Sequence, residues 1–219
     1  KKESDTSLAR SKLAINAETV IAIMPGSRKA EINQHIEVLY DAAELIIKES
    51  IKYNFKNIQF VVPTVFYELE NELKLNRPNL YKNFHFCVDA SMAISSSDFV
   101  ITKSGTSTLQ VALNKKPMIV IYRMSSATYF FLKAFNLVKT KYAALPNILF
   151  NDEVVPELIQ SNFTADNICK EFIKIMTDEE RKINLRKKFE VMHDDLAADS
   201  ASESARVIMD LLNKTIADS

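Results

Sequence analysis

An apolar, strand-like run passes directly into a helix-like run along Val20-Ile21-Ala22-Ile23-Met24-Pro25-Gly26-Ser27-Arg28-Lys29-Ala30-Glu31-Ile32. The corner between the two runs holds Gly26, one of only two glycines in the 219 residues. The other, Gly105, follows the apolar run 99–102 and precedes a second helix-like run. Glycine allows a turn with positive φ and lets a ligand come close to bare backbone. We therefore expect a small anionic ligand to bind at these two strand-to-helix corners.

Five short apolar runs, rich in β-branched and aromatic residues, indicate strands that are buried on both faces. They cover residues 19–24, 58–62, 84–88, 99–102 and 118–122. Helix-like patterns lie between them at residues 31–51, 65–75, near Ser91, and 106–114. This alternation predicts an α/β fold, a Rossmann-like doubly wound parallel sheet, whose ligands bind at the carboxyl ends of the strands.

The chain divides by pattern into three parts. Residues 1–18 form a polar lead segment, residues 19–177 the ligand-binding domain, and residues 178–219 C-terminal helices. Thr164 is expected to cap the helix before the charged one at 178–195, and a last helix is expected at about 202–212. Because the chain has no initiating methionine and enters its first strand after a short polar lead, we expect it to be a fragment of a longer protein.

Composition excludes several classes of protein. Lys and Arg total 28 and balance 28 Asp and Glu, so no net charge attracts nucleic acid. The two cysteines, Cys87 and Cys169, form no CxxC pair and favour a reduced, cytoplasmic setting. No stretch reaches the roughly 18 uncharged apolar residues of a membrane span. We expect a globular cytoplasmic protein that binds no nucleic acid.

The first corner offers the chemistry of a diphosphate site. Gly26 permits the tight turn, Ser27 is expected to cap the following helix, and Arg28 brings a permanent positive charge. The alternative is that Ser27 is only a cap and Arg28 pairs with a surface carboxylate. The second corner, Ser104-Gly105-Thr106-Ser107-Thr108, offers hydroxyls and backbone donors at another helix start. Two such corners in one sheet favour an elongated nucleotide.

Several motifs, in their order and spacing, resemble the lipid-A-disaccharide synthases, which are GT-B glycosyltransferases of Gram-negative bacteria. They are Met24-Pro25-Gly26-Ser27-Arg28 with Glu31-Ile32, Ser104-Gly105-Thr106-Ser107-Thr108-Leu109, Lys116-Pro117-Met118-Ile119-Val120-Ile121-Tyr122-Arg123, Leu145-Pro146-Asn147-Ile148-Leu149 and Val155-Pro156-Glu157-Leu158. That family has two Rossmann-like domains, and this chain is similar to the C-terminal, donor-binding one. The resemblance implies transfer of 2,3-diacylglucosamine from UDP to 2,3-diacylglucosamine 1-phosphate. The products are lipid A disaccharide 1-phosphate, a lipopolysaccharide precursor, and UDP.

The resemblance also assigns roles by position. It implies that Arg28 meets the UDP diphosphate beside Gly26 and Ser27, that residues 104–106 (Ser104, Gly105 and Thr106) form a phosphate-binding loop, and that Asn147 lies near the nucleotide. The alternative for Asn147 is a turn residue that holds its own backbone. Gln110 stands where the family usually has a glutamate that binds the ribose hydroxyls. An amide keeps that geometry but loses the charge-assisted part of the hydrogen bond.

Three further residues are candidates for the nucleotide site. Glu31 lies in the first turn of the first long helix, and Tyr122 and Arg123 end the fifth strand on the ligand side. For Arg123, a salt bridge to a helix is an equal alternative. His35, one turn after Glu31, is expected on a polar face or paired, with reach into the active cleft as the alternative. No metal or other cofactor is expected, because the side chains of His193-Asp194-Asp195 diverge on a helix and the resemblance implies transfer without metal.

The expected partners follow from the resemblance as well. They are a UDP-diacylglucosamine donor and an N-terminal acceptor domain of the same enzyme, which supplies the catalytic base, so this chain alone should bind UDP without turnover. The resemblance also implies that the C-terminal helices 178–219 return to that domain through an apolar stripe on the last helix, made of Val207, Ile208, Leu211 and Leu212. The aromatic cluster 129–135 is expected in a core, in a subunit contact or docked shallowly on the inner membrane. The oligomeric state of the protein is left open. The alternatives are another UDP-sugar enzyme, an N-acetylglucosaminyltransferase or a UDP-GlcNAc 2-epimerase, and a non-catalytic nucleotide-binding module.

Overall fold

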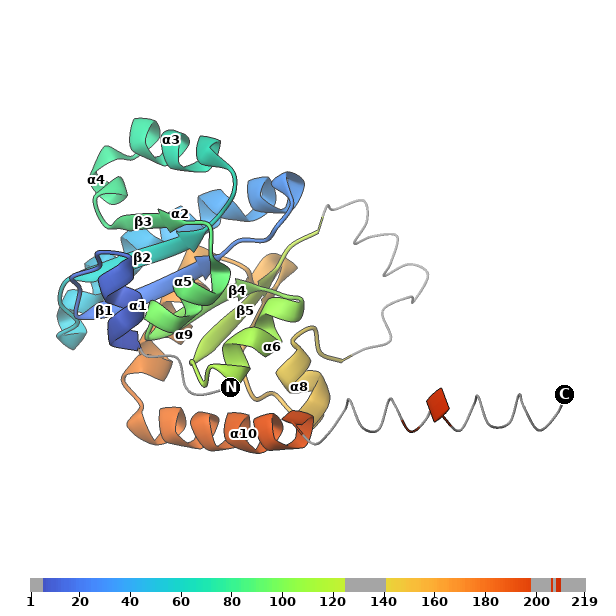
Figure 1. Cartoon of the computed structure of the whole chain (residues 1–219). Coiled ribbons are helices and arrows are strands. Elements are labelled where there is room, and N and C mark those ends of the chain that lie inside the picture. Colours follow the sequence, from blue (N-terminus) through green and yellow to red (C-terminus); the bar gives the residue numbers. More distant parts are fainter. Residues whose placement is uncertain (1–5, 125–140, 198–205, 207, 210–219) are drawn as a thin grey trace, which may run out of the picture.

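The computed structural model describes residues 6–124, 141–197, 206, 208 and 209. In this part of the chain, parallel strands form one sheet in the order β3-β2-β1-β4-β5-β6 (Figure 1). The strands are β1 (Thr19–Met24), β2 (Ile58–Pro63), β3 (Phe84–Cys87), β4 (Phe99–Lys103), β5 (Met118–Tyr122) and β6 (Glu157–Ile159). The order reverses between β1 and β4, as in a doubly wound Rossmann sheet, so the predicted fold class is confirmed.

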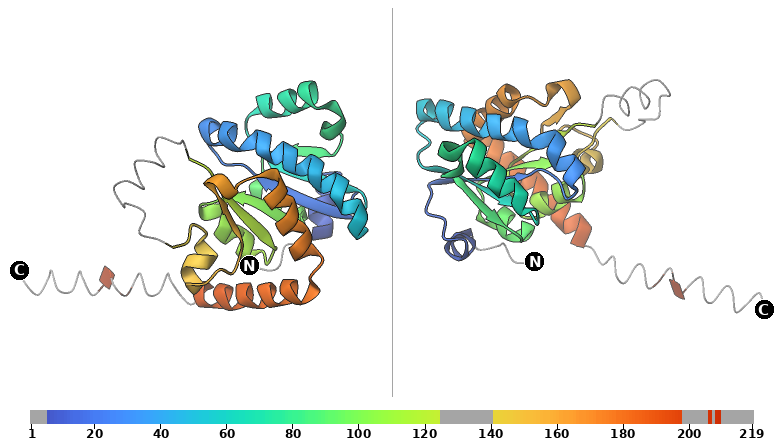
Figure 2. Two further views of the ribbon diagram at one scale, coloured as in Figure 1. Left: turned by 180° about the vertical axis from the view of Figure 1, so that it is seen from behind. Right: turned by 90° about the horizontal axis from the view of Figure 1, so that it is seen from above.

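Helices cover both faces of the sheet, because successive residues of a buried strand point to opposite sides. Ile21 and Ile23 pack on one face, and Val20, Ala22 and Met24 on the other. The first face carries α2 (Lys29–Ser50), α3 (Tyr67–Asn76), α4 (Pro78–Tyr81) and α9 (Ala165–Met176), and the second carries α1 (Thr6–Lys12), α5 (Ala90–Ser96), α6 (Thr106–Leu113), α8 (Leu145–Phe150) and α10 (Glu179–Ala197). Figure 1 looks onto α1, α5 and α6, and the left view of Figure 2 onto α2 and α9.

The first five strands lie where the sequence predicts them, with ends shifted by at most one residue. The sixth, β6, is not predicted. It has three residues, follows Pro156 and begins with the charged Glu157, so it lacks the apolar run that marks the other five. It pairs in parallel with the β5 edge through Ile121 and Leu158.

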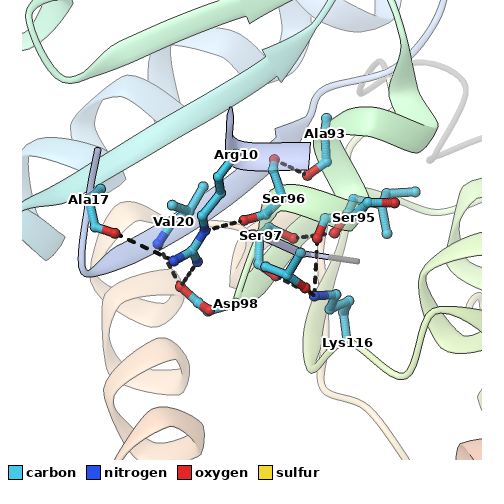
Figure 3. A network of polar contacts seen from close by, with 11 residues as sticks. Arg10, Ala17, Val20, Ala93, Ser95, Ser96, Ser97, Asp98 and Lys116 are labelled. Carbon is cyan, nitrogen blue, oxygen red and sulfur yellow. Dashed lines mark hydrogen bonds and ion pairs between the residues drawn. The ribbon is translucent and has the colours of Figure 1, made fainter. Parts of the chain in front are cut away.

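Part of the lead segment folds onto the domain, although its sequence shows no apolar periodicity. Arg10 donates a 2.6 Å hydrogen bond to Asp98, whose carboxylate also accepts the Val20 N–H at 2.8 Å (Figure 3). In the same network, Lys116 donates to the Ser97 carbonyl at 2.7 Å, just beyond the last turn of α5. These bonds tie α1 and α5 to the amino ends of β1 and β4, the edge opposite the glycine corners.

Of the C-terminal helices, α9 and α10 pack on this same domain, whereas the described Ile208 and Met209 beyond them are exposed. Thr164 caps α9 as expected, accepting the Asn167 N–H at 3.2 Å. The predicted charged helix is α10, which contacts α6 and α9 and buries Leu185, Phe189 and Met192. Of the apolar stripe expected on the last helix, Ile208 is described and is 56% exposed, while Val207, Leu211 and Leu212 lie outside the described residues, as does the cluster 129–135. None of the described helices is both long and apolar enough to cross a membrane.

Candidate functional site

The two glycine corners lie side by side at the switch point of the sheet. Gly26 follows β1 and Gly105 follows β4, and these two strands are hydrogen-bonded neighbours whose last residues pair as Met24 with Thr102. The φ angles of Gly26 and Gly105 are +130° and +148°, a region that other residues rarely adopt. Doubly wound sheets bind ligands in the crevice at this point. The structure therefore brings together the two corners that the sequence singled out.

A pocket of about 330 Å³ opens at this crevice. Its polar side consists of Gly26, Ser27, Glu31, Lys103 and residues 104–107 with Gln110. Its apolar side lies beyond the ends of β2 and β3 and includes Val65, Phe66 and Val88, of which Val65 and Val88 are exposed. The pocket thus has a charged, hydrogen-bonding end and an apolar end, which suits a ligand with a phosphate part and a flat ring.

The first corner differs from its predicted geometry in one respect. Helix α2 begins at Lys29, so its N-cap residue is Arg28 and no side chain caps it. The expectation that Ser27 caps this helix is therefore wrong. Ser27 instead lines the pocket, and its backbone hydrogen-bonds the carboxylate of Glu31 in the first turn of α2. That carboxylate lies so close to Gly26 that a Cβ added there would be 2.8 Å from Glu31 Oε2.

Glu31 is held between two cations. Its Oε1 lies 3.1 Å from Lys103 Nζ and 3.3 Å from Arg28 Nη1. Burial alone would raise the pKa of Glu31, but the hydrogen bond and charge of Lys103, the charge of Arg28 and the Ser27 backbone together lower it below its usual value. Glu31 therefore stays ionised at neutral pH.

Arg28 and Lys103 occupy different positions relative to the pocket. The Arg28 side chain is 82% exposed and lies outside the pocket lining, whereas Lys103 is 21% exposed and lines it. The surface pairing considered for Arg28 is thus what the structure contains, with Glu31 as the partner. The sequence does not predict Lys103 as a site residue, because its pattern indicates only the polar end of a strand.

The second corner presents donors at the start of α6. Gly105 is the N-cap residue of this helix, and apart from its two chain neighbours no atom of the described residues lies within 4 Å of a Cβ built on it. Thr106 and Gln110 are exposed and line the pocket. The first turn of a helix leaves backbone N–H groups without an intrahelical acceptor, so this end can bind an anion. Ser104 lines the pocket too, although its hydroxyl donates to the Ala143 carbonyl at 2.7 Å.

Asn147 is placed away from the pocket. It is fully buried, its Nδ2 donates to the Val155 carbonyl and to Glu157, each at 2.8 Å, and its Oδ1 accepts the N–H groups of Val154 and Val155. The amide has no capacity left for a ligand. The expected nucleotide contact is thus contradicted, because Asn147 is used to hold the backbone that leads into β6.

Tyr122 and Arg123 also have partners within the protein. The Tyr122 ring lies 5.5 Å from Lys103 Nζ, at the side of the pocket. The Arg123 guanidinium stacks 4.8 Å from the Phe163 ring and donates to the Phe163 carbonyl, and among the described residues it forms no salt bridge with a helix. Its contact with a substrate stays a prediction.

His35 joins the two strand ends that flank the site. Its Nδ1 donates to the Pro25 carbonyl at 2.9 Å and its Nε2 accepts the Arg123 N–H at 3.2 Å. The accepting Nε2 fixes the neutral tautomer with the proton on Nδ1. Burial lowers the pKa of His35, against the opposing effect of these hydrogen bonds. His35 is therefore paired, as one of the expectations had it, but it is fully buried and not on a polar face, and it links the Gly26 corner to the end of β5.

In the part of the chain that the structure describes, no three His, Cys, Asp or Glu side chains come together as a metal site requires. His193 Nδ1 instead lies 2.9 Å from Lys115 Nζ. That the site works without metal stays a prediction.

Comparison with known proteins gives a consistent assignment. A family model described as Lipid-A-disaccharide synthetase matches residues 1–209. A lipid-A-disaccharide synthase of Chromobacterium violaceum is 32% identical in a 217-residue alignment that covers 95% of this chain and 54% of that protein. A lipid-A-disaccharide synthase of Xanthomonas campestris is 30% identical in an alignment that covers 97% of this chain and 48% of that protein. The chain spans about half the length of these relatives.

Solved structures show the same fold at low identity. The ADP-heptose lps heptosyltransferase II of E. coli has a TM-score of 0.56 and 14% identity, with 82% of this chain and 53% of that chain covered. The UDP-GlcNAc 2-epimerase of Neisseria meningitidis, bound to UDP-GlcNAc, has a TM-score of 0.51 and 14% identity, with 87% and 48% covered. At this identity the likeness concerns the fold alone.

Proposed function

Because the chain belongs to the lipid-A-disaccharide synthetase family, we propose that it is the donor-binding half of a hexosyltransferase that uses a UDP-sugar. The whole enzyme transfers 2,3-diacylglucosamine from UDP to 2,3-diacylglucosamine 1-phosphate and releases UDP. The observation that carries this proposal is the meeting of the Gly26 and Gly105 corners over one pocket at the switch point of the sheet.

The chemistry of this half is the stabilisation of the leaving group. When the bond between the sugar and the diphosphate breaks, negative charge develops on the phosphate oxygens of UDP. Backbone N–H groups at the start of α6 and the guanidinium of Arg28 oppose that charge. The Arg28 side chain is exposed and bound to one carboxylate oxygen, so it can turn to a phosphate at little cost.

Other residues of the pocket bind the nucleoside part of UDP. Gln110, exposed and in the pocket lining, hydrogen-bonds the ribose hydroxyls, while Val65 and Val88 pack against the base. The acceptor sugar and the catalytic base belong to an N-terminal domain of the same protein, which accounts for the other half of the relatives' length. The acylated substrates favour a cytoplasmic enzyme with peripheral contact to the inner membrane.

The proposal is tested by calorimetric titration of the chain with UDP, ADP and CDP at one salt concentration. UDP should bind, and ADP and CDP should bind more weakly. Arg28→Ala should weaken UDP binding about threefold to tenfold, because it removes a charged partner of the diphosphate. Arg186→Ala is the matched control, since Arg186 is also exposed and paired with a glutamate on its own helix. No binding of UDP, or equal binding of all three, would contradict the proposal.

Turnover provides a separate check. Mixed with the UDP-diacylglucosamine donor and the acylated acceptor, this chain alone should form no disaccharide, whereas the full-length enzyme should. Disaccharide formation by the chain alone would contradict the proposed division of labour between two domains.

A further inference from the structure

Lys103 brings an ammonium group into the pocket between the two glycine corners. It is the last residue of β4, it lines the pocket, and its side chain is 21% exposed. Its stem runs past the first corner, since a Cβ built on Gly26 would lie 3.7 Å from Lys103 Cδ. The second corner follows it directly in the chain at Ser104 and Gly105. The ammonium is therefore at the place where both corners can share one ligand.

The charges around Lys103 are arranged as a cation, an anion and a second cation. Glu31 Oε1 accepts from Lys103 at 3.1 Å and from Arg28 at 3.3 Å. The three side chains carry a net positive charge. A carboxylate at the phosphate end of a pocket repels an anionic ligand, so Glu31 is unfavourable for binding unless it has another use.

That use follows from the geometry. An unpaired ammonium in a partly buried pocket is costly, and Glu31 removes this cost while no ligand is bound. The Tyr122 ring, 5.5 Å from Lys103 Nζ, favours the cation from another side and keeps it inside the pocket. A diphosphate offers several charged acceptors and can replace one carboxylate oxygen as the partner of both cations.

We propose that Lys103 binds the diphosphate of the nucleotide directly, and that Glu31 occupies its ammonium until the ligand arrives. This inference rests on the proposed function, because it requires that the pocket takes a nucleoside diphosphate. It assigns the main diphosphate cation to the end of β4, with Arg28 reaching in from solvent. A lysine suits this position because its three donors form a compact point charge that adapts to neighbouring phosphate oxygens.

The competing explanation is that Lys103 only ties β4 to α2 through Glu31. A structural tie would affect every ligand of the pocket alike, because its loss would disturb both corners. A direct contact affects only ligands that carry phosphate. Uridine and UDP differ in just this part, so comparing them separates the two explanations.

The test titrates UDP by calorimetry and uridine by ligand-observed NMR into the parent chain, Lys103→Met, Lys103→Arg and Lys182→Met. Lys182 is the matched control because it is 25% exposed, is paired with a glutamate, and lies at the amino edge of the sheet. Lys103→Met should bind UDP about tenfold to a hundredfold more weakly, as expected for a lost hydrogen bond to a charged group. Lys103→Met should bind uridine with the affinity of the parent chain. Lys103→Arg should recover most of the UDP affinity, and Lys182→Met should bind both ligands as the parent does.

A second variant tests the role of Glu31. Glu31→Gln removes the competing charge and should tighten UDP binding about twofold to tenfold, because two cations are released and one repulsion is lost. Circular dichroism and thermal melting verify that each variant is folded.

The outcomes separate this inference from the proposed function. If the parent binds UDP and Lys103→Met binds it equally well, or loses uridine and UDP affinity together, the inference is overturned and the proposed function stands. Weaker UDP binding by a folded Glu31→Gln variant would overturn the role given to Glu31. A folded parent chain that binds no UDP would overturn the proposed function itself.

Discussion

Replacing Gly26 with alanine should destabilise the protein more than the same change at Gly105. Both glycines have positive φ angles, so an alanine at either position is strained by about 1–3 kcal/mol. The surroundings differ. A Cβ at Gly105 meets no described residue beyond its chain neighbours within 4 Å, whereas one at Gly26 lies 2.8 Å from Glu31 Oε2 and 3.2 Å from Glu31 Cβ. Glu31 must therefore move when Gly26 is replaced.

The magnitude follows from what Glu31 loses by moving. Its ion pair with Lys103 is mostly shielded from solvent, each side chain being 21% exposed, and contributes about 1 kcal/mol net. Gly26→Ala should thus cost about 2–4 kcal/mol and Gly105→Ala about 1–3 kcal/mol. In a chain of this size 1 kcal/mol shifts the melting temperature by about 2–4 °C, so the Gly26 variant should melt about 2–4 °C below the Gly105 variant.

Thermal melting and urea unfolding of the two variants measure this difference, and a double-mutant cycle assigns it to Glu31. In a Glu31→Ala background the carboxylate is already absent, so the cost of Gly26→Ala should fall by about 1 kcal/mol, while the cost of Gly105→Ala stays the same. Equal costs for the two glycines in the parent, or a cost for Gly26→Ala that Glu31→Ala does not change, would refute the close contact between the Gly26 corner and Glu31.

Three other predictions concern groups around the site. Burial lowers the pKa of His35 in the folded protein, so as the pH falls below about 6.5 the unfolded chain binds a proton at His35 before the folded protein does. The free energy of unfolding should then fall by up to about 1.4 kcal/mol per pH unit for this group. Urea unfolding at several pH values should find a smaller slope in His35→Gln. Asn147→Ala leaves buried backbone groups unpaired and should cost about 2–4 kcal/mol in urea unfolding, yet a folded variant should bind UDP like the parent; selective loss of UDP affinity would restore Asn147 to the site. Partial burial of Cys87 and burial of Cys169 raise the pKa of both thiols to about 11, so mass spectrometry should find them slow to react with iodoacetamide at pH 7.5 until the protein unfolds. Rapid labelling of either thiol in the native protein would contradict its raised pKa.

The sheet could be predicted where strands are buried on both faces. The strands β1 and β5 lie within such runs, and the sequence places both ends of each correctly. Strand β6 could not be predicted in this way, because Glu157 faces a polar network in which its carboxylate accepts the N–H groups of Ala143 and Ala144. Helix α1 escapes prediction for a related reason. It is held by Arg10 and Asp98, whose side chains meet across 88 positions of sequence, and periodicity cannot show such a pair.

The site could be predicted as far as it depends on local backbone. Gly26 and Gly105 mark the corners because glycine is so rare in this chain. Lys103 escapes detection because its importance comes from Glu31, 72 positions away. The signal that could have found it is a lysine at the carboxyl end of an otherwise apolar strand, directly before a serine and a glycine. Asn147 misleads because its buried partners lie in a later segment that no local pattern connects to it.

Because the chain has only two glycines, one measurement can test directly whether both glycine corners bind one nucleotide. Protein labelled with ¹⁵N at glycine alone should show two backbone amide signals, those of Gly26 and Gly105. Titration with UDP should move both signals with one common dissociation constant, and titration with uridine should move them less. Saturation of the protein with UDP while either signal keeps its position would contradict a shared diphosphate site at the switch point of the sheet.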